Sequence, residues 1–305
     1  MRLPRRLTRA LRPTAHALLG AVTVATLRGI RRFDPKKTAN FGAWMARKFG
    51  PLLREHRIGR QNLAAAFPEK TPEEIEALLL QVWDNLGRFG GEFAHLDRIW
   101  DYDLAHPERS RIELPPESIA IFEKLMADGK GALVFASHLA NWELPALAAP
   151  AYGLPSAVLF RRPNVAAIDT AVQDIRAVNM GEMISTGIDA PVRLAKALQR
   201  GLHVGMLVDQ YYTKGVEITF FGRTTRANPL LARLAQKIDC PIHGTRIVRL
   251  PNGRYRAEIT DEIAPVRDAG GEIDVQATTQ KINSIIEGWI REHPEQWLWL
   301  HRRWR

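Results

Sequence analysis

Beyond Asp101, short apolar runs rich in β-branched residues alternate with stretches of helical periodicity, and this alternation constrains the fold most strongly. The runs predicted as strands are Ala132–Ala136, Ser156–Phe160, Met183–Thr186, His203–Val208, Ile218–Phe221, Ile242–Val248 and Tyr255–Thr260. The stretches predicted as helices are Pro116–Ala127, Val165–Val178, Pro191–Gln199, Pro229–Ile238 and Val275–Glu292. Strands that alternate with helices build parallel sheets. The sequence therefore predicts an α/β fold with a central, mostly parallel sheet flanked by helices.

The residues before this region have a helical pattern instead. From Thr38 to Asp97, apolar residues recur at spacings of three and four, which is typical of amphipathic helices. Thr71-Pro72, followed by two glutamates, is a helix start with proline in the first turn. We therefore expect a helical N-terminal extension, a basic segment over residues 1–37 and one domain over 38–305. Within that domain we expect helices over 38–115, the α/β core over 116–275, and a C-terminal helix and tail over 276–305.

The net charge of +10 is concentrated near the N-terminus. Residues 1–60 carry 15 basic side chains against Asp34 and Glu55, a net charge of +13. The other 245 residues carry 28 basic and 31 acidic side chains, a net charge of −3. A local basic arm suits a polyanion or an anionic membrane surface, while the near-neutral body argues against a nucleic-acid-binding face. The single cysteine, Cys240, excludes a disulfide framework and fits a reducing compartment.

An uncharged run from Pro13 to Leu27 lies within this basic region, with arginines on both sides. As a helix it would span roughly 22 Å, whereas a bilayer crossing needs about 20 apolar residues. The arginines directly after the run disfavour an exported signal peptide. We therefore expect membrane attachment, either through an interfacial helix whose arginines reach lipid phosphates or through a short single-pass anchor. The alternative is a solvated basic helix packed on the body.

The common motifs for dinucleotides, phosphate loops, serine hydrolases and zinc peptidases are absent from the sequence. What the chain has is a predicted strand, Ala132–Ala136, that leads into His138, with Glu143 five residues later. In open α/β sheets, sites form beyond the carboxyl ends of the strands. Pro145 is tolerated in a first helical turn, so we expect a helix to begin near Asn141. His138 would then lie in the preceding loop, where its ring can turn back toward Glu143.

A histidine beside a carboxylate suits acyl transfer to a hydroxyl group. The neutral imidazole takes the hydroxyl proton, and a carboxylate on the other ring nitrogen fixes the tautomer and stabilises the imidazolium. No nucleophilic serine or cysteine is needed if the acceptor alcohol attacks a thioester directly. The spacing alone is equally compatible with a structural pair of a loop histidine and a nearby acid.

Several segments together resemble one enzyme family. His138 and Glu143 resemble the H-x₄-[DE] motif of glycerolipid-type acyltransferases. The other segments are similar to motifs of the late acyltransferases of lipid A biosynthesis, the lauroyl and myristoyl transferases: Arg57–Glu69 (R-x₄-N-L-x₃-F-P-E), Phe160–Asn164 (R-P-N), Val208–Gln210 (D-Q) and Pro294–Trp304 (P-E-Q-x-x-W-L-H-R-R-W). The resemblance covers about residues 40–305, and the C-terminal signature is its most specific part.

This resemblance implies a glycerol-3-phosphate-acyltransferase-like fold and a membrane-bound enzyme at the cytoplasmic face of a Gram-negative inner membrane. It implies transfer of a fatty acyl chain from acyl carrier protein to a hydroxyl of a lipid A precursor, a glycolipid. Within this reaction His138 is expected to be the general base and Glu143 the residue that orients it. Neither a cofactor nor a metal ion is implied, and the expected partners include anionic lipid but no nucleic acid.

The other candidate site residues are predicted to contact substrate. Arg162, beside Arg161, follows a strand and precedes a proline, so its guanidinium could bind a phosphate or form a surface ion pair. Arg176, on the next predicted helix, has the same two interpretations. Asp209 ends the strand His203–Val208 at the same edge as His138, where it could contact substrate or support the site. Gln210 and Asn141 are predicted as further polar contacts.

Three other functions remain open from the sequence. One is acylation of a lysophospholipid or another membrane glycolipid. A second is a basic peripheral membrane or nucleic-acid-binding protein without enzymatic activity. The third is a metal hydrolase that uses His138 and Glu143, which would need further ligands that the sequence does not cluster.

Overall fold

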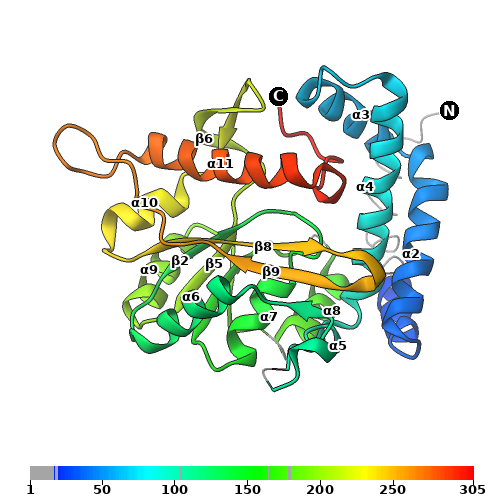
Figure 1. The fold of residues 1–305 in the computed structure, drawn as a ribbon, viewed down its shortest axis with the longest axis horizontal. Helices are drawn as coiled ribbons and strands as arrows, with labels where there is room; N and C mark the ends of the chain where they lie inside the picture. The colour runs from blue at the N-terminus through cyan, green and yellow to red at the C-terminus, as the bar shows by residue number, and fades with distance from the viewer. Residues whose placement is uncertain (1–16, 18–19, 104, 164, 178–179) are drawn as a thin grey trace.

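The structure is a computed structural model of the chain and describes residues 17, 20–103, 105–163, 165–177 and 180–305. Its centre is a seven-stranded sheet in the order β1-β9-β8-β2-β5-β3-β4, with helices on both faces (Figure 1). The strands of this sheet are β1 (Ile112–Glu113), β2 (Leu133–Ala136), β3 (Ser156–Phe160), β4 (Glu182–Ser185), β5 (His203–Leu207), β8 (Ile242–Arg249) and β9 (Tyr255–Ile259). All neighbours are parallel except β8 and β9, which confirms the predicted α/β fold with a mostly parallel sheet.

Two apolar cores cover the two faces of this sheet. The larger one packs side chains of α4 (Pro72–Phe93), α9, α10 and α11 against β2, β3 and β5. The smaller one packs α5 and α7 with residues of β8 and β9. The bounds of the helices around the sheet are α5 (Leu96–Ile99), α6 (Pro116–Ala127), α7 (Leu144–Ala151), α8 (Ala166–Ala177), α9 (Ala190–Gln199), α10 (Leu230–Lys237) and α11 (Val275–Glu292).

The sequence predicted most of these elements within one or two residues, and two of the helices, α6 and α11, have the predicted bounds. Two strands were missed. Strand β1 is only two residues long and lies in the stretch predicted as helical, where it pairs in parallel with β9. Strand β7 (Arg223–Ala227) forms an antiparallel hairpin with β6 (Tyr211–Phe220), so the predicted strand Ile218–Phe221 is the end of a longer one.

Helices precede the sheet, as predicted. They are α2 (Pro35–Phe49), the 3₁₀ turn η1 (Gly50–Leu52), α3 (Arg54–Ala66) and α4 (Pro72–Phe93). The Thr71 side chain accepts a hydrogen bond from Glu74, whose carboxylate accepts one from the Thr71 backbone, so α4 begins at the predicted place with a capping box. Figure 1 shows α4 standing across the end of the sheet toward which β8 points, with α2 on its outer side.

The N-terminal prediction is only partly covered by the structure. Residues 20–30 are helical, while the first sixteen residues, and part of the uncharged run from Pro13 to Leu27, lie outside the described residues. In the part of the chain that the structure describes, no helix has both the length and the apolarity needed to cross a membrane.

Candidate active site

His138 and Asp209 lie just beyond the ends of two neighbouring parallel strands, at the same level. The strands β2 and β5 pair with Ala136 opposite Leu207, and each of the two polar residues follows two positions later. The side chains meet as this register requires: Nδ1 of His138 is 2.8 Å from Oδ1 of Asp209. The backbone N–H of His138 also donates to Oδ2 of the same carboxylate, at 2.8 Å. Asp209 therefore holds both the ring and the main chain of His138.

Asp209 is fully buried, and its charge is stabilised by what surrounds it. Its Oδ2 also accepts a 2.7 Å hydrogen bond from the indole N–H of Trp297. Burial alone would raise the pKa of Asp209, but the charge of His138 and the hydrogen bonds from His138 and Trp297 outweigh it and hold this pKa well below its usual range. An anionic Asp209 accepts the Nδ1–H of the imidazole, so the free lone pair of neutral His138 lies on Nε2.

The His138 ring is partly open to solvent, and its Nε2 meets Gln210, which is an exposed residue. The histidine side chain is 14% exposed, whereas Asp209 behind it is not exposed at all. The side-chain amide of Gln210 lies 3.2 Å from Nε2 and donates to it, because Nδ1 carries the ring proton. The ring packs edge-on against Trp142, which in turn stacks on Phe89 of α4. The imidazole is thus fixed on three sides, and its Nε2, the nitrogen that can act as a base, has the Gln210 amide as its partner.

Glu143 does not hold this imidazole, and the sequence-based pairing of the two residues was wrong. Arg176 of α8 donates from Nε to Oε2 of Glu143 at 2.9 Å, and its Nη2 donates to Oε1. Helix α7 begins at Leu144 rather than near Asn141, which leaves Glu143 at its N-cap. From there the carboxylate faces α8 and forms a two-pronged ion pair with a guanidinium, while both ring nitrogens of His138 have other partners.

Asn141 also has a different place from the one expected. It is fully buried, and its amide donates to Oε2 of Glu92 at 2.9 Å. Arg249 of β8 donates to both oxygens of Glu92, and its Nη1 also donates to the hydroxyl of Tyr255 at 2.9 Å. Asn141 therefore anchors the loop of His138 to a buried ion pair rather than facing open solvent.

The Glu92–Arg249 pair is stabilised in its charged form despite its burial. Burial would raise the pKa of Glu92, but the charge and hydrogen bonds of Arg249 lower it below its usual value. Burial would lower the pKa of Arg249, but the charge of Glu92 outweighs this effect, so the pKa of Arg249 is raised. Two compensated charges that are buried together form a rigid support, and removing either one leaves the other unpaired.

The C-terminal tail closes the site from a third direction. The backbone N–H of Ala140 donates to the carbonyl of Gln296, and the N–H of Leu298 donates to the carbonyl of His138. Ala140 has a positive φ of 49°, a backbone conformation that residues other than glycine rarely adopt. The loop is therefore held in a strained turn. Sequence reasoning missed these contacts, although Gln296 and Trp297 lie in the C-terminal signature that it identified.

The remaining candidates are less tightly placed. Arg162 follows β3, its side chain is 61% exposed, and it lies 3.9 Å from Asp169, which fits the surface interpretation. Arg176 meets Glu143 and lies over the ring of Phe93. The structure thus brings together His138, Asp209 and Gln210 at one point, and joins Glu143 to Arg176 at another.

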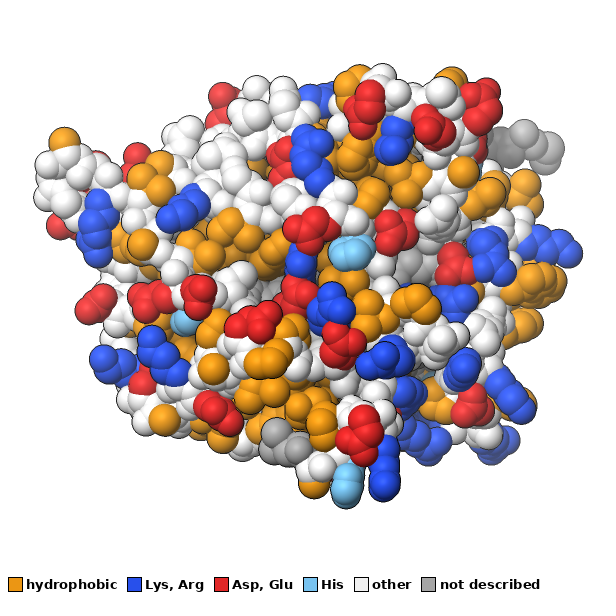
Figure 2. All heavy atoms as spheres, in the orientation of Figure 1, with side chains coloured by type: hydrophobic (Ala, Val, Ile, Leu, Met, Phe, Trp, Pro, Cys, Tyr) orange, Lys and Arg blue, Asp and Glu red, His pale blue; other side chains and the backbone are white. Residues whose placement is uncertain are grey.

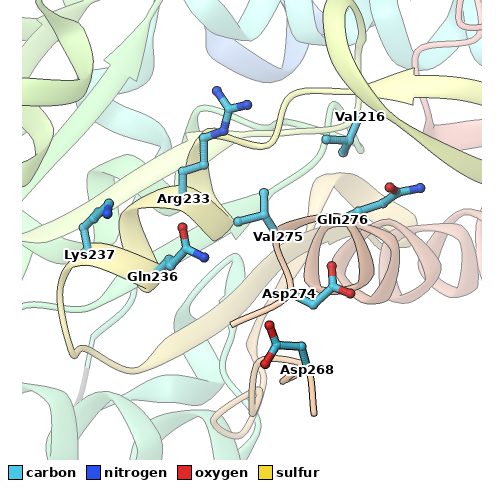
Figure 3. A pocket seen from close by; sticks show the side chains of 8 residues that line it. All are labelled: Val216, Arg233, Gln236, Lys237, Asp268, Asp274, Val275 and Gln276. Atoms are coloured by element: carbon cyan, nitrogen blue, oxygen red, sulfur yellow. The ribbon is translucent and has the colours of Figure 1, made fainter. Parts of the chain in front are cut away.

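One cavity lies apart from the predicted site residues. Its volume is about 640 Å³. The side chains that line it are drawn in Figure 3: Val216, Arg233, Gln236, Lys237, Asp268, Asp274, Val275 and Gln276. None of these is a predicted site residue, and Asp274 is used as the N-cap of α11. Over the described ranges, no group of three or more His, Cys, Asp or Glu side chains is arranged to hold a metal ion.

Comparison with known proteins relates the whole chain to one family of enzymes. The family model for "Bacterial lipid A biosynthesis acyltransferase" matches residues 8–305. The chain is 27% identical over 269 residues to the lipid A biosynthesis palmitoleoyltransferase of Escherichia coli (strain K12), covering 86% of this chain and 81% of that protein. It is 22% identical over 284 residues to lipid A biosynthesis acyltransferase 2 of Shigella flexneri, covering 89% and 85%. With the lipid A biosynthesis myristoyltransferase of Escherichia coli (strain K12) the identity is 21% over 282 residues, covering 91% and 84%.

Proposed function

The chain belongs to the bacterial lipid A biosynthesis acyltransferase family, and on that basis we propose how it catalyses its reaction. A fatty acyl chain passes from the thioester of acyl carrier protein to a hydroxyl of a lipid A precursor, with His138 as the general base. The observation that carries this proposal is the placement of His138, whose Nδ1 is fixed on buried Asp209 while its Nε2 meets only the amide of the exposed Gln210 among the hydrogen bonds described.

The proton moves through Nε2 of His138. As the acceptor hydroxyl oxygen attacks the thioester carbonyl carbon, Nε2 takes the hydroxyl proton and the ring becomes an imidazolium. The buried Asp209 carboxylate stabilises that cation through Nδ1–H. When the tetrahedral intermediate collapses, the carbon–sulfur bond breaks and the leaving thiolate takes the proton from Nε2. His138 then returns to its neutral form, and the products are an ester and the free thiol of the carrier.

Negative charge on the substrate needs a cation, and we assign this role to Arg176. Glu143 occupies its Nε and Nη2 and so fixes the plane of the guanidinium. The Arg176 side chain is 17% exposed, so it is accessible while being held in one orientation. A pre-oriented guanidinium stabilises an oxyanion or a phosphate more than a mobile one does. Glu143 thus acts through Arg176, and Asp209 takes over the role first expected of Glu143.

The reaction is proposed to take place at the cytoplasmic face of the inner membrane. The charge distribution supports this location, because the first 60 residues carry a net charge of +13 from 15 basic and 2 acidic side chains. Such a surface attracts anionic lipid and also the acidic carrier protein.

The proposal is tested by an acyl-transfer assay with purified full-length protein. Donors are an acyl carrier protein thioester and the matching coenzyme A thioester, and acceptors are a lipid A precursor and a lysophospholipid, with products weighed by mass spectrometry. We expect transfer from the carrier to the lipid A precursor, and a 10²–10⁴-fold lower kcat, roughly, for His138→Ala. The matched control is His106→Ala, because His106 is 52% exposed and contacts only Glu108 among the charged groups described.

Three results would contradict the proposal separately. Wild-type kcat in a folded His138→Ala variant would exclude the general base. A strong preference for the coenzyme A thioester would exclude the carrier as donor. Acylation of the lysophospholipid without acylation of the lipid A precursor would exclude the proposed acceptor.

A further inference from the structure

The outer face of α2 and η1 exposes an unusual number of large apolar side chains. Of the 13 large hydrophobic residues that are exposed in the described part of the chain, seven lie between Phe33 and Leu53. Five of the seven recur at helical spacing, and we call them the outer stripe: Phe41 (63% exposed), Trp44 (46%), Met45 (37%), Phe49 (44%) and Leu52 (79%). Since their spacings are one, three and four, they lie along one side of the helix. A contiguous apolar face of this kind marks an interaction surface.

The inner face of α2 has the opposite character, because it consists of small residues. Ala39 and Ala43 are buried against α4. A Cβ on Gly42 would lie 2.2 Å from the backbone oxygen of Gly87, so the two helix backbones touch where both residues are glycine. Helices of water-soluble proteins turn their large apolar residues inward. Small residues at the helix contact and large apolar residues outside are instead the arrangement of helices that face lipid.

The charged residues in the sequence of α2 and its flanks are almost all basic, although Arg47 among them pairs with Asp84 of α4. Between Arg32 and Arg54 the sequence contains six basic residues and one acidic residue, Asp34, which caps α2. The Lys48 ammonium group lies within the stripe, 5.2 Å from the ring centre of Trp44 and 5.6 Å from that of Phe49. Figure 2 shows Lys and Arg side chains next to hydrophobic ones along the edge of the molecule where α2 lies. Aromatic rings beside lysine ammonium groups suit the boundary between lipid headgroups and acyl chains.

A second copy of the chain fits this surface less well than lipid does. A two-fold contact would place the patch against itself, and its basic residues would then face basic residues. An anionic bilayer instead matches both the apolar stripe and the charge of its rim. We propose that the outer stripe of α2 and η1 lies in the headgroup–acyl boundary of an anionic leaflet, with the helix parallel to the membrane plane.

This surface is rigidly connected to the catalytic loop. Gly87 and Gly91 of α4 contact α2, whereas Phe89 and Glu92 of the same helix contact Trp142 and Asn141 beside His138. One helix layer, about 8–10 Å between axes, therefore separates the lipid-facing helix from the loop that carries the base. The outer stripe thus places the site at a fixed height above the leaflet, independently of which acceptor is used.

The proposal is tested by vesicle binding of the full-length protein. The stripe variant carries Trp44→Ser, Phe49→Ser and Leu52→Ser. The matched control carries Met126→Ser, Ile188→Ser and Val192→Ser, which are exposed apolar residues (46%, 102% and 58%) on other parts of the molecule. On phosphatidylethanolamine–phosphatidylglycerol vesicles we expect the partition coefficient of the stripe variant to fall about tenfold or more. The control variant should bind within twofold of the wild type.

A second measurement does not depend on the stability of that variant. In a Cys240→Ser background, an environment-sensitive fluorophore is attached at Phe41→Cys, Leu52→Cys or Ile188→Cys. We expect a similar blue shift at positions 41 and 52 on adding vesicles, as for a helix in the membrane plane, and none at 188. Activity of the stripe variant on detergent-solubilised substrates should stay within threefold of the wild type, which separates this proposal from that of the reaction.

Either of two results would overturn the proposal. One is unchanged vesicle binding by the stripe variant together with no blue shift at positions 41 and 52. The other is a dimer of the wild type, measured by light scattering, that the stripe substitutions convert to a monomer, because a second copy would then cover the stripe.

Discussion

Asp209 and Glu143 are both buried carboxylates at the loop of His138, yet they have different partners. Asp209 comes from the neighbouring strand, is fully buried and accepts hydrogen bonds from His138 and Trp297. Glu143 is five residues from His138 in the chain, is 6% exposed and pairs with Arg176 of α8. The difference teaches that strand register, more than closeness in sequence, decides which acid meets an imidazole. In the proposed reaction, the buried Asp209 side of the site serves the base, and the Glu143 side serves the cation Arg176.

The substitution Asp209→Asn removes the buried carboxylate that holds His138, and we expect it to have the largest effect on kcat. Without the carboxylate the imidazole loses the partner that fixes its tautomer and stabilises its charged form, so we expect kcat to fall by about 10³–10⁴. Steady-state kinetics with saturating donor measure this change. The folded state of the variant is checked by circular dichroism, and a kcat within tenfold of the wild type would show that Asp209 is not the partner that matters.

The buried ion pair behind Asn141 tests whether the loop needs its support. Glu92→Gln leaves Arg249 buried and unpaired, so we expect a loss of about 3–5 kcal/mol in the free energy of unfolding. Chemical denaturation measures it. Glu182→Gln is the matched control, because it removes an exposed pair with Arg200 and should cost less than about 1 kcal/mol. Equal losses in the two variants would mean that the buried pair contributes no special stability.

The substitution Glu143→Gln tests the second carboxylate, which pairs with Arg176 rather than with His138. The amide can accept only part of the two-pronged hydrogen bond from Arg176, so the guanidinium is held less firmly. We expect kcat/KM to fall by about 10–100-fold, less than for Asp209→Asn, if the pair positions a cation for the substrate. A double-mutant cycle with Arg176→Gln should show strong coupling between the two residues. Additive effects, or a loss as large as that of Asp209→Asn, would contradict the division of roles.

The burial of the tail beside Asp209 should also make the free energy of unfolding depend on pH. His301 lies in the C-terminal tail and packs against Trp297. Its Nδ1 donates to the carbonyl of Leu298, and its Nε2 is buried without a partner among the described residues. Burial lowers the pKa of His301 to about 4, while the unfolded value is about 6.5. The folded state therefore binds fewer protons, so stability is complete above pH 6.5 and is lost as the pH falls toward 4.

At pH 5.5 this group alone should cost about 1 kcal/mol of the free energy of unfolding. The measurement compares denaturation of the wild type and of His301→Gln at pH 7.5 and pH 5.5. We expect the difference between the two pH values to shrink in the variant. An equal pH dependence in both proteins would mean that His301 is not sealed from solvent.

The sheet could be predicted because its strands are short apolar runs with helices between them. Strand β1 was not predicted because two residues are too few to show a periodic pattern. Its partners, Tyr255 and Arg256 of β9, also lie more than 140 positions away in the sequence. Strand β7 escaped because Arg223–Ala227 is mostly polar and is stabilised as a strand by its antiparallel partner β6.

His138 could be predicted because it follows a buried strand, and Asp209 because it ends another at the same edge. The pairing was wrong because the direction of the Glu143 side chain depends on where α7 begins and on Arg176, 33 positions later. The roles of Trp297 and Gln296 depend on the tail folding back over the loop, and no local pattern encodes that contact.

The most direct test of this account is the tautomer of His138, measured by ¹⁵N NMR of protein labelled in the histidine rings. The signal is assigned by its loss in His138→Gln. We predict a protonated Nδ1 and an unprotonated Nε2 in the neutral ring of the wild type and of Glu143→Gln, and loss of this preference in Asp209→Asn. A tautomer that survives Asp209→Asn but changes in Glu143→Gln would contradict the assignment of Asp209 as the partner of the base.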